Sequence, residues 1–254
     1  CLGVDQIIAK KETPNIIKSF LLASGIRSIS PIVDLGNFSM LLTGQPLNMY
    51  NAKLNPSLTY QVFDDYEGMF TAFDGKELKL KTGDLVVFDD KKPICLAGIL
   101  AGQNESITDE TDSIAIEAAS FYHANIRHTA IRLGLSSFSQ QLFGKSRNPY
   151  MIDEALEMTI SLLPLFFEHY RIFSYSTYNN LPSKETKIDF SLEKMNHRLG
   201  SSYTDSQVSE VLKRYRIKKE GDLLYPPIDR VDLKEQCDIE EEVFRFYDAD
   251  EIHP

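Results

Sequence analysis

A polar stretch at residues 179–187, which reads NNLPSKETK, divides the chain into two parts. It contains a proline and is typical of a linker. The sequence patterns differ on its two sides, and 254 residues are enough for two modest domains with separate cores. We therefore expect an α+β chain with two domains, one at 1–183 and one at 188–254.

The first part alternates between strand and helix signals. A helix is expected after Thr13 and Pro14, because threonine is a favoured cap and proline fits the first helical position, and Gly25 would end it. Short β-like runs follow at 58–63, 85–88, 94–99 and 114–118. Helical stretches come next at 124–133 and 148–163. Pro164 would end or kink the last of them. This part is expected to be the larger domain, built on a mixed sheet.

The second part has short helices with clear boundaries. One is expected at 191–199, where Gly200 would close it. Thr204 and Gln207 form a capping box in front of another. A turn at 220–222 leads to a short strand, and a final helix runs from about 238 to 247. These signals predict a small helix-rich domain with a short β hairpin.

The overall composition argues against several classes of protein. The formal net charge is −10, so there is no global electrostatic reason for tight nucleic-acid binding, and an RNA partner would have to be held locally. No apolar run reaches the roughly 18 residues of a membrane span, and charged residues at 10–12 interrupt any signal peptide. Cys1, Cys95 and Cys237 lie far apart and form no CxxC, which is typical of a cytoplasmic protein. A chain that begins with cysteine also suggests a piece of a longer protein.

Carboxylates cluster near the C-terminal end. Asp238, Glu241 and Glu242 share one face of the expected last helix, and Asp232 from the preceding loop could join them. Three carboxylates within one turn repel each other unless water, arginine or a cation compensates. Four hard oxygen ligands without histidine or cysteine would suit magnesium. The alternative is a solvated acidic first turn, which the helix dipole favours and Arg245 balances.

Four segments together resemble the β subunit of bacterial phenylalanine–tRNA ligase. GIRSISPIVDLGNFSMLLTGQPLNMYN at 25–51 is similar to a signature with GIR and VVD-x-TNYVMLE-x-GQPLHAFD, and LAGILAG at 96–102 resembles LAGIMGG. IEAASFYHANIRHTAIRLGL at 116–135 resembles LEAAxFxPxxIRxTARxLGL. PPIDRVDLKEQCDIEEEVFRFYDADEIHP at 226–254 resembles PSxRxDIxxExDLIEEVARIYGYDxIP. The segments follow the family's order at plausible spacing, so the combination is specific.

This resemblance implies that the chain supports ATP-dependent charging of tRNA(Phe) with phenylalanine. It implies an editing domain that hydrolyses mischarged tyrosyl-tRNA, followed by a small domain that helps to dock an α subunit. In the family, the α subunit binds ATP, phenylalanine and the tRNA 3′ end within a cytoplasmic α2β2 tetramer, so this piece lacks the aminoacylation site. Magnesium ligands shared with the α subunit are implied at Asp232, Asp238, Glu241 and Glu242.

The same resemblance implies an editing pocket in the larger domain. The matching catalytic positions are Asn37, Asn48, Glu117 and Ser137, and the matching substrate-binding positions are Gly98 and Gly102. Glu117 is expected to read the tyrosine hydroxyl, the alternative being a partly buried structural carboxylate. The pocket departs from the family pattern, since Gly36 replaces a threonine, Asn48 a histidine and Ala101 a glycine. Asparagine cannot relay protons near neutral pH, so we expect weakened hydrolysis.

Three other readings stay open. The chain could be a non-catalytic scaffold that docks the α subunit and tRNA. It could be a free-standing editing hydrolase, although the acidic C-terminal motif argues for a larger ligase. Basic residues at 213–219 could make it a nucleic-acid-binding module, but such residues at a helix end also complement the helix dipole. Hydrolysis of tyrosyl-tRNA and binding to an α subunit would separate these readings.

Overall fold

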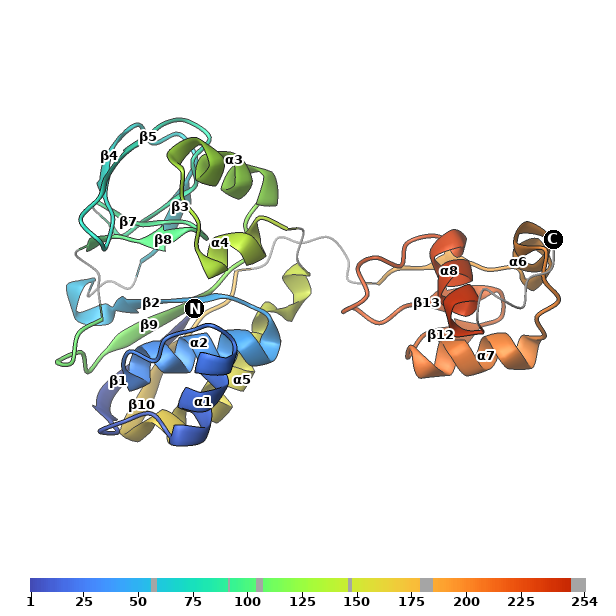
Figure 1. The fold of residues 1–254 in the computed structure, drawn as a ribbon, viewed down its shortest axis with the longest axis horizontal. Coiled ribbons are helices and arrows are strands. Elements are labelled where there is room, and N and C mark those ends of the chain that lie inside the picture. Colours follow the sequence, from blue (N-terminus) through green and yellow to red (C-terminus); the bar gives the residue numbers. More distant parts are fainter. Residues whose placement is uncertain (56–58, 91, 104–106, 146–147, 179–184, 248–254) are drawn as a thin grey trace. The chain divides into compact units, whose positions relative to one another are not determined.

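The computed structural model describes residues 1–254 apart from 56–58, 91, 104–106, 146–147, 179–184 and 248–254. The chain divides into two compact units, Cys1–Tyr178 and Asn179–Pro254 (Figure 1). Both combine helices with antiparallel strands, so the α+β class expected from the sequence is confirmed. None of the described helices is long and apolar enough to cross a membrane.

A four-stranded antiparallel sheet is the base of the first unit. Its strand order is β10 (Phe167–Tyr175), β1 (Leu2–Ala9), β9 (Ile114–Ala118) and β2 (Leu47–Asn51). The helices packed on it are α1 (Asn15–Ala23), α2 (Pro31–Thr43) and α5 (Ile152–Phe166) (Figure 1). The core between sheet and helices is mainly aliphatic, and Leu35, Ile116 and Leu163 are fully buried in it. Burial of this apolar surface is the main force that holds the helices on the sheet.

Shorter strands and two helices build the rest of the first unit. A second sheet has the order β3 (Gln61–Phe63), β6 (Val86–Phe88), β7 (Pro93–Leu96) and β8 (Leu100–Ala101), and a separate hairpin joins β4 (Gly68–Thr71) to β5 (Glu77–Leu80). Helices α3 (His123–Leu133) and α4 (Phe138–Phe143) complete it, with 3₁₀ turns at Ala52–Leu54 and Pro149–Met151. Ile126 of α3 and Phe143 of α4 are buried with Leu96 of β7. A smaller cluster, which includes Tyr50, Cys95 and Ala115, joins this part to the first sheet.

Three local features differ from the sequence-based expectation. Helix α2 is not predicted by a 3.6-residue pattern, because apolar residues lie on several of its sides; instead Ser30 caps it and Gly44 ends it in the left-handed region at φ 72°. Thr13 does not cap α1, since its hydroxyl donates to Asp34 Oδ2 at 2.6 Å. Pro164 lies within α5, so the helix ends two residues after this proline, at Phe166, and not before it.

The second unit packs three helices on a small antiparallel sheet. The sheet has the order β11 (Ile188–Asp189), β13 (Leu223–Tyr225) and β12 (Lys218–Glu220). The helices are α6 (Leu192–Leu199), α7 (Asp205–Arg214) and α8 (Gln236–Phe246). The capping box of Thr204 and Gln207 forms as the sequence predicts. Met195, Val211 and Ile239 are among the fully buried residues of its core.

Candidate functional site

Two neighbouring strands bring Asn48 and Glu117 together. Strands β2 and β9 pair antiparallel, and their register places Asn48 directly opposite Glu117. The Asn48 amide, through Nδ2, donates to Glu117 Oε2 over 3.4 Å. The Tyr50 hydroxyl, two residues farther along β2, donates to the same oxygen. The half-buried Glu117 carboxylate is therefore held by two donors from one strand.

These three side chains lie on the face of the first sheet that points away from its helical core. Successive residues of a strand point to opposite faces. Met49 packs with the helices, whereas Tyr50 belongs to the cluster that includes Ile94 and Cys95 of β7. The candidate pocket therefore lies between the first sheet and the second, as far as the described residues show.

Burial sets the protonation of the groups around Glu117. Burial raises the pKa of Glu117, and the hydrogen bonds from Tyr50 and Asn48 counteract part of this rise. Burial also raises the pKa of Tyr50 and of Cys95 well above their ordinary values, and the Cys95 thiol donates to the Leu100 carbonyl oxygen. Tyr50 and Cys95 thus keep their protons at neutral pH, and Cys95 is no thiolate nucleophile.

Asn37 lies apart from this pair. It is half-buried on α2, directly after Gly36. A Cβ at Gly36 would come within 3.0 Å of Met49 Cε, which places this part of α2 against the helical side of β2. Among the described residues, Asn37 makes no hydrogen bond to Asn48 or Glu117. The structure therefore joins two of the expected catalytic residues and leaves Asn37 on a different element.

The remaining expected pocket residues have structural roles, in the turn between β7 and β8, at a close backbone contact and at the start of α4. Gly98 has φ 67° in the turn between β7 and β8, where a Cβ would come within 3.0 Å of the Phe143 ring. At Gly102, a Cβ would lie 2.7 Å from the Ile94 carbonyl oxygen. Ser137 caps α4, and its hydroxyl donates to the Ile99 carbonyl oxygen at 2.8 Å. Each of these contacts has a structural explanation that needs no substrate.

Two surface hollows lie on the first unit, and neither includes Glu117. One, of about 630 Å³, lies between α3 and α4 and is lined by residues that include His123, Arg127 and Lys145. The other, of about 470 Å³, lies along α2 and α5 and includes Thr43 and Glu157. Neither hollow has Asn48 or Tyr50 in its lining. Neither of these two hollows is therefore the expected substrate pocket.

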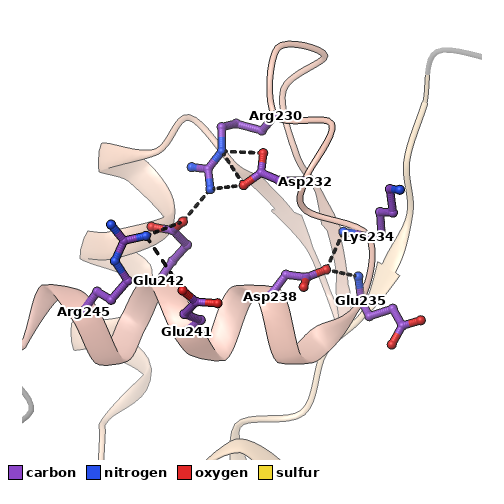
Figure 2. Close-up of polar contacts among 8 residues, drawn as sticks. All are labelled: Arg230, Asp232, Lys234, Glu235, Asp238, Glu241, Glu242 and Arg245. Carbon is purple, nitrogen blue, oxygen red and sulfur yellow. Dashed lines mark hydrogen bonds and ion pairs between the residues drawn. The ribbon is translucent and has the colours of Figure 1, made fainter. Parts of the chain in front are cut away.

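The C-terminal carboxylates are held by arginine and by backbone (Figure 2). Arg230 lies between Asp232, 2.7 Å from its Nη2, and Glu242, and these contacts raise its pKa while the Arg230 hydrogen bond lowers the pKa of Asp232. Asp238 instead accepts hydrogen bonds from two backbone amides, at 2.8 and 2.9 Å, at the start of α8. Glu241 is exposed, with Arg245 3.9 Å away. Four carboxylates that the sequence groups together therefore have two kinds of partner, which are arginine side chains and backbone amides.

This arrangement does not fit a magnesium ion as it stands. A magnesium site needs several oxygen ligands around one point. Within the described ranges, no group of three or more histidine, cysteine, aspartate or glutamate side chains is placed to hold a metal ion. Arg230 supplies the positive charge between Asp232 and Glu242 that such an ion would supply. A magnesium ion shared with another subunit stays a prediction.

Sequence reasoning missed two residues that organise these sites. Tyr50 is one, although its position two residues after Asn48 on a strand already predicts a shared face. Arg230 is the other, and its signal was the Arg-x-Asp spacing with Asp232. Neither long-range contact, to Glu117 or to Glu242, could be deduced from spacing, because each joins separate elements.

Comparison with known proteins places the chain in a family. Residues 3–168 match the B3/4 domain, and residues 188–248 match the tRNA synthetase B5 domain. The chain is 31% identical over 237 residues to the phenylalanine–tRNA ligase β subunit of Staphylococcus epidermidis, 33% over 249 residues to that of Fusobacterium nucleatum, and 34% over 253 residues to that of Francisella tularensis.

These matches cover 91, 95 and 96% of this chain but only 30, 31 and 32% of the relatives, so the chain spans less than a third of their length. A crystal structure of an N-terminal fragment of the phenylalanyl-tRNA synthetase β subunit from Pyrococcus horikoshii aligns with 97% of this chain and 69% of its own, with a TM-score of 0.41 and 13% identity. By its domain match the chain belongs to the B3/4 domain family, and together with the B5 match these relatives identify it as part of a phenylalanine–tRNA ligase β subunit.

Proposed function

We propose that this chain works within a phenylalanine–tRNA ligase and supports ATP-dependent charging of tRNA(Phe) with phenylalanine. The names of its relatives and the tRNA synthetase B5 match support this role. Charging itself is assigned to an α subunit, which would bind ATP, in a cytoplasmic α2β2 assembly that also binds tRNA. The second unit would then be a docking module.

For the first unit we infer a weakened editing site for tyrosyl-tRNA, centred on Glu117. Its carboxylate is half-buried and can accept a hydroxyl hydrogen bond, which is how a site distinguishes tyrosine from phenylalanine. Hydrolysis of the ester also needs a group that takes a proton from the attacking water. The contact between Asn48 and Glu117 carries this proposal, because it puts an amide at the position where proton transfer would need an imidazole.

Hydrolysis of tyrosyl-tRNA by the whole chain tests this proposal. Asn48→His should release tyrosine at least about tenfold faster than the wild type, since general-base catalysis contributes about 10²–10⁴-fold. Asn51→His is the matched control. It makes the same change on the same strand, but residue 51 points to the opposite face of the sheet from residue 48. Slow release by both variants would contradict the role given to Asn48.

A non-catalytic scaffold is the second candidate. It is favoured by the Glu117 carboxylate, because this carboxylate already has two internal donors. This candidate predicts that neither the wild type nor Asn48→His hydrolyses tyrosyl-tRNA, while the chain still binds an α subunit. Co-purification of the two subunits, measured beside the hydrolysis assay, therefore separates the two functions.

A further inference from the structure

We propose that Tyr50 is an internal occupant of the candidate pocket, whose hydroxyl takes a Glu117 oxygen that would otherwise accept the hydroxyl of a tyrosyl substrate. This inference rests on the proposed editing function and deepens it. It makes Tyr50 a specificity-determining residue: the chain's own phenol weakens the distinction between tyrosyl and phenylalanyl groups.

The packing of Tyr50 fixes its hydroxyl on Glu117. Only 1% of Tyr50 is exposed, and its ring stacks on that of Tyr60 with centroids 5.1 Å apart. Buried residues from the second sheet, including Val87 and Ile94, complete its surroundings. A side chain packed in this way loses little further freedom when it donates a hydrogen bond, so the contact with Glu117 is preorganised.

The limited hydrogen-bonding capacity of Glu117 means that the bond from Tyr50 weakens the binding of a substrate hydroxyl. A carboxylate oxygen accepts about two hydrogen bonds. Glu117 Oε2 already receives one from Tyr50 and one from Asn48. A substrate hydroxyl could then donate only to Oε1. The two existing hydrogen bonds already fix the orientation of the carboxylate and stabilise its charge. Burial also raises the pKa of Tyr50, so the hydroxyl stays protonated and remains a donor at neutral pH.

The hydroxyl of Tyr50 can be removed without removing the ring. Strand β2 reads LNMYN, and the signature that this segment resembles has phenylalanine at the position of Tyr50. The ring can therefore be expected to pack without its hydroxyl. Tyr50→Phe removes the donor to Glu117 while it preserves the stacking on Tyr60 and the apolar contacts.

The experiment uses the whole chain and two stable probes, 3′-amino-3′-deoxyadenosine acylated through an amide with tyrosine or with phenylalanine. Titration calorimetry gives the Kd of each. The wild type should bind both probes within about twofold of each other. Tyr50→Phe should bind the tyrosyl probe about tenfold more tightly and leave the phenylalanyl Kd unchanged, because one charged hydrogen bond becomes available. Glu117→Gln in the Tyr50→Phe background should remove most of this gain.

Tyr170→Phe is the matched control, since Tyr170 lies on β10 at the opposite edge of the same sheet from β2. It should leave both Kd values unchanged. If both probes bind but Tyr50→Phe does not alter their ratio, Tyr50 is no occupant and only this inference is overturned. If no variant binds either probe, the first unit is no aminoacyl-ester site, and both the proposed function and this inference fail.

Discussion

Gly102 is a residue at which two stretches of backbone approach closely. Its amide donates to the Ile94 carbonyl oxygen at 2.8 Å, and a Cβ would lie 2.7 Å from that same oxygen. Gly102→Ala should therefore lower the free energy of unfolding by about 1–3 kcal/mol, as measured by urea denaturation. Gly36→Ala is the control, since its Cβ would contact the flexible end of Met49, and it should stay within about 1 kcal/mol of the wild type. Equal losses in the two variants would contradict the close approach.

Glu117 should make stability depend on pH. Burial raises its pKa above the ordinary value of 4.5, although Tyr50, Asn48 and the Cys1 amine oppose this rise. The folded chain thus holds this proton more tightly than the unfolded chain, so its contribution to stability is present below pH 4.5 and is lost as pH rises through the folded pKa. Glu117→Gln should flatten this decline in urea midpoints above about pH 4.5.

The exposed Glu168 provides the control for this titration. It lies on β10, where Glu168→Gln should leave the wild-type slope unchanged. A slope that is the same in Glu117→Gln as in the wild type would mean that the Glu117 carboxyl titrates alike in the folded and unfolded chains. That result would contradict the expectation that burial raises the pKa of Glu117.

Residue types could be predicted from the sequence more readily than their contacts. The resemblance pointed to Glu117 and Asn48, which the register of β2 and β9 then brings together. It also grouped Gly98 with the pocket, whereas the structure explains this residue by its φ of 67° and its contact with Phe143. A glycine needed for a turn and one needed for a ligand look alike in a single sequence, because both depend on the missing side chain.

At the scale of elements, capping signals were the most informative part of the sequence. They predicted α6, which Gly200 closes, and α7 with its capping box, because these interactions are local. The strand at Ile114–Ala118 was also predicted in full. Helix α2 was missed, since residues that contact both the sheet and other helices blur the one-sided apolar stripe. The pairing order of the strands depends on long-range contacts that a local pattern does not contain.

The loop before α8 and the helix itself are joined by Arg230 (Figure 2). Arg230→Gln should lower the free energy of unfolding of the second unit by about 1–3 kcal/mol. Most of this loss should come from Glu242, whose side chain is 9% exposed, because Asp232 is 60% exposed and well screened by water. Circular dichroism of the whole chain, followed during heating, would measure the change in Tm of this unit.

Arg245→Gln is the matched control for this contact. Arg245 is 64% exposed and lies 3.8 Å from Glu242, so its loss should cost no more than about 0.5 kcal/mol. Magnesium should raise the Tm of Arg230→Gln but not that of the wild type, because only the variant lacks a cation between Asp232 and Glu242. A rise in the wild-type Tm of the same size would contradict this expectation, because Arg230 would then not exclude the ion.

At the scale of the whole molecule, each unit has a core built from its own residues. The clusters around Leu35, Leu96 and Tyr50 belong to the first unit, and the cluster around Met195 belongs to the second. The two domain matches, at 3–168 and 188–248, fall on the same two units. Folding is cooperative within a core, so two separate cores predict two separable unfolding transitions.

Ile239→Ala tests this independence in the whole chain. Ile239 is fully buried in the second unit, and its truncation should cost about 2–5 kcal/mol there. Hydrogen exchange followed by mass spectrometry should show faster exchange in α6, α7 and α8 while the sheet of the first unit keeps its protection. The reciprocal variant, Ile116→Ala, should loosen the first sheet and leave α7 protected. A parallel loss of protection in both units would show that one cooperative transition spans the chain, and separate roles for a pocket unit and a docking unit would then lose their structural basis.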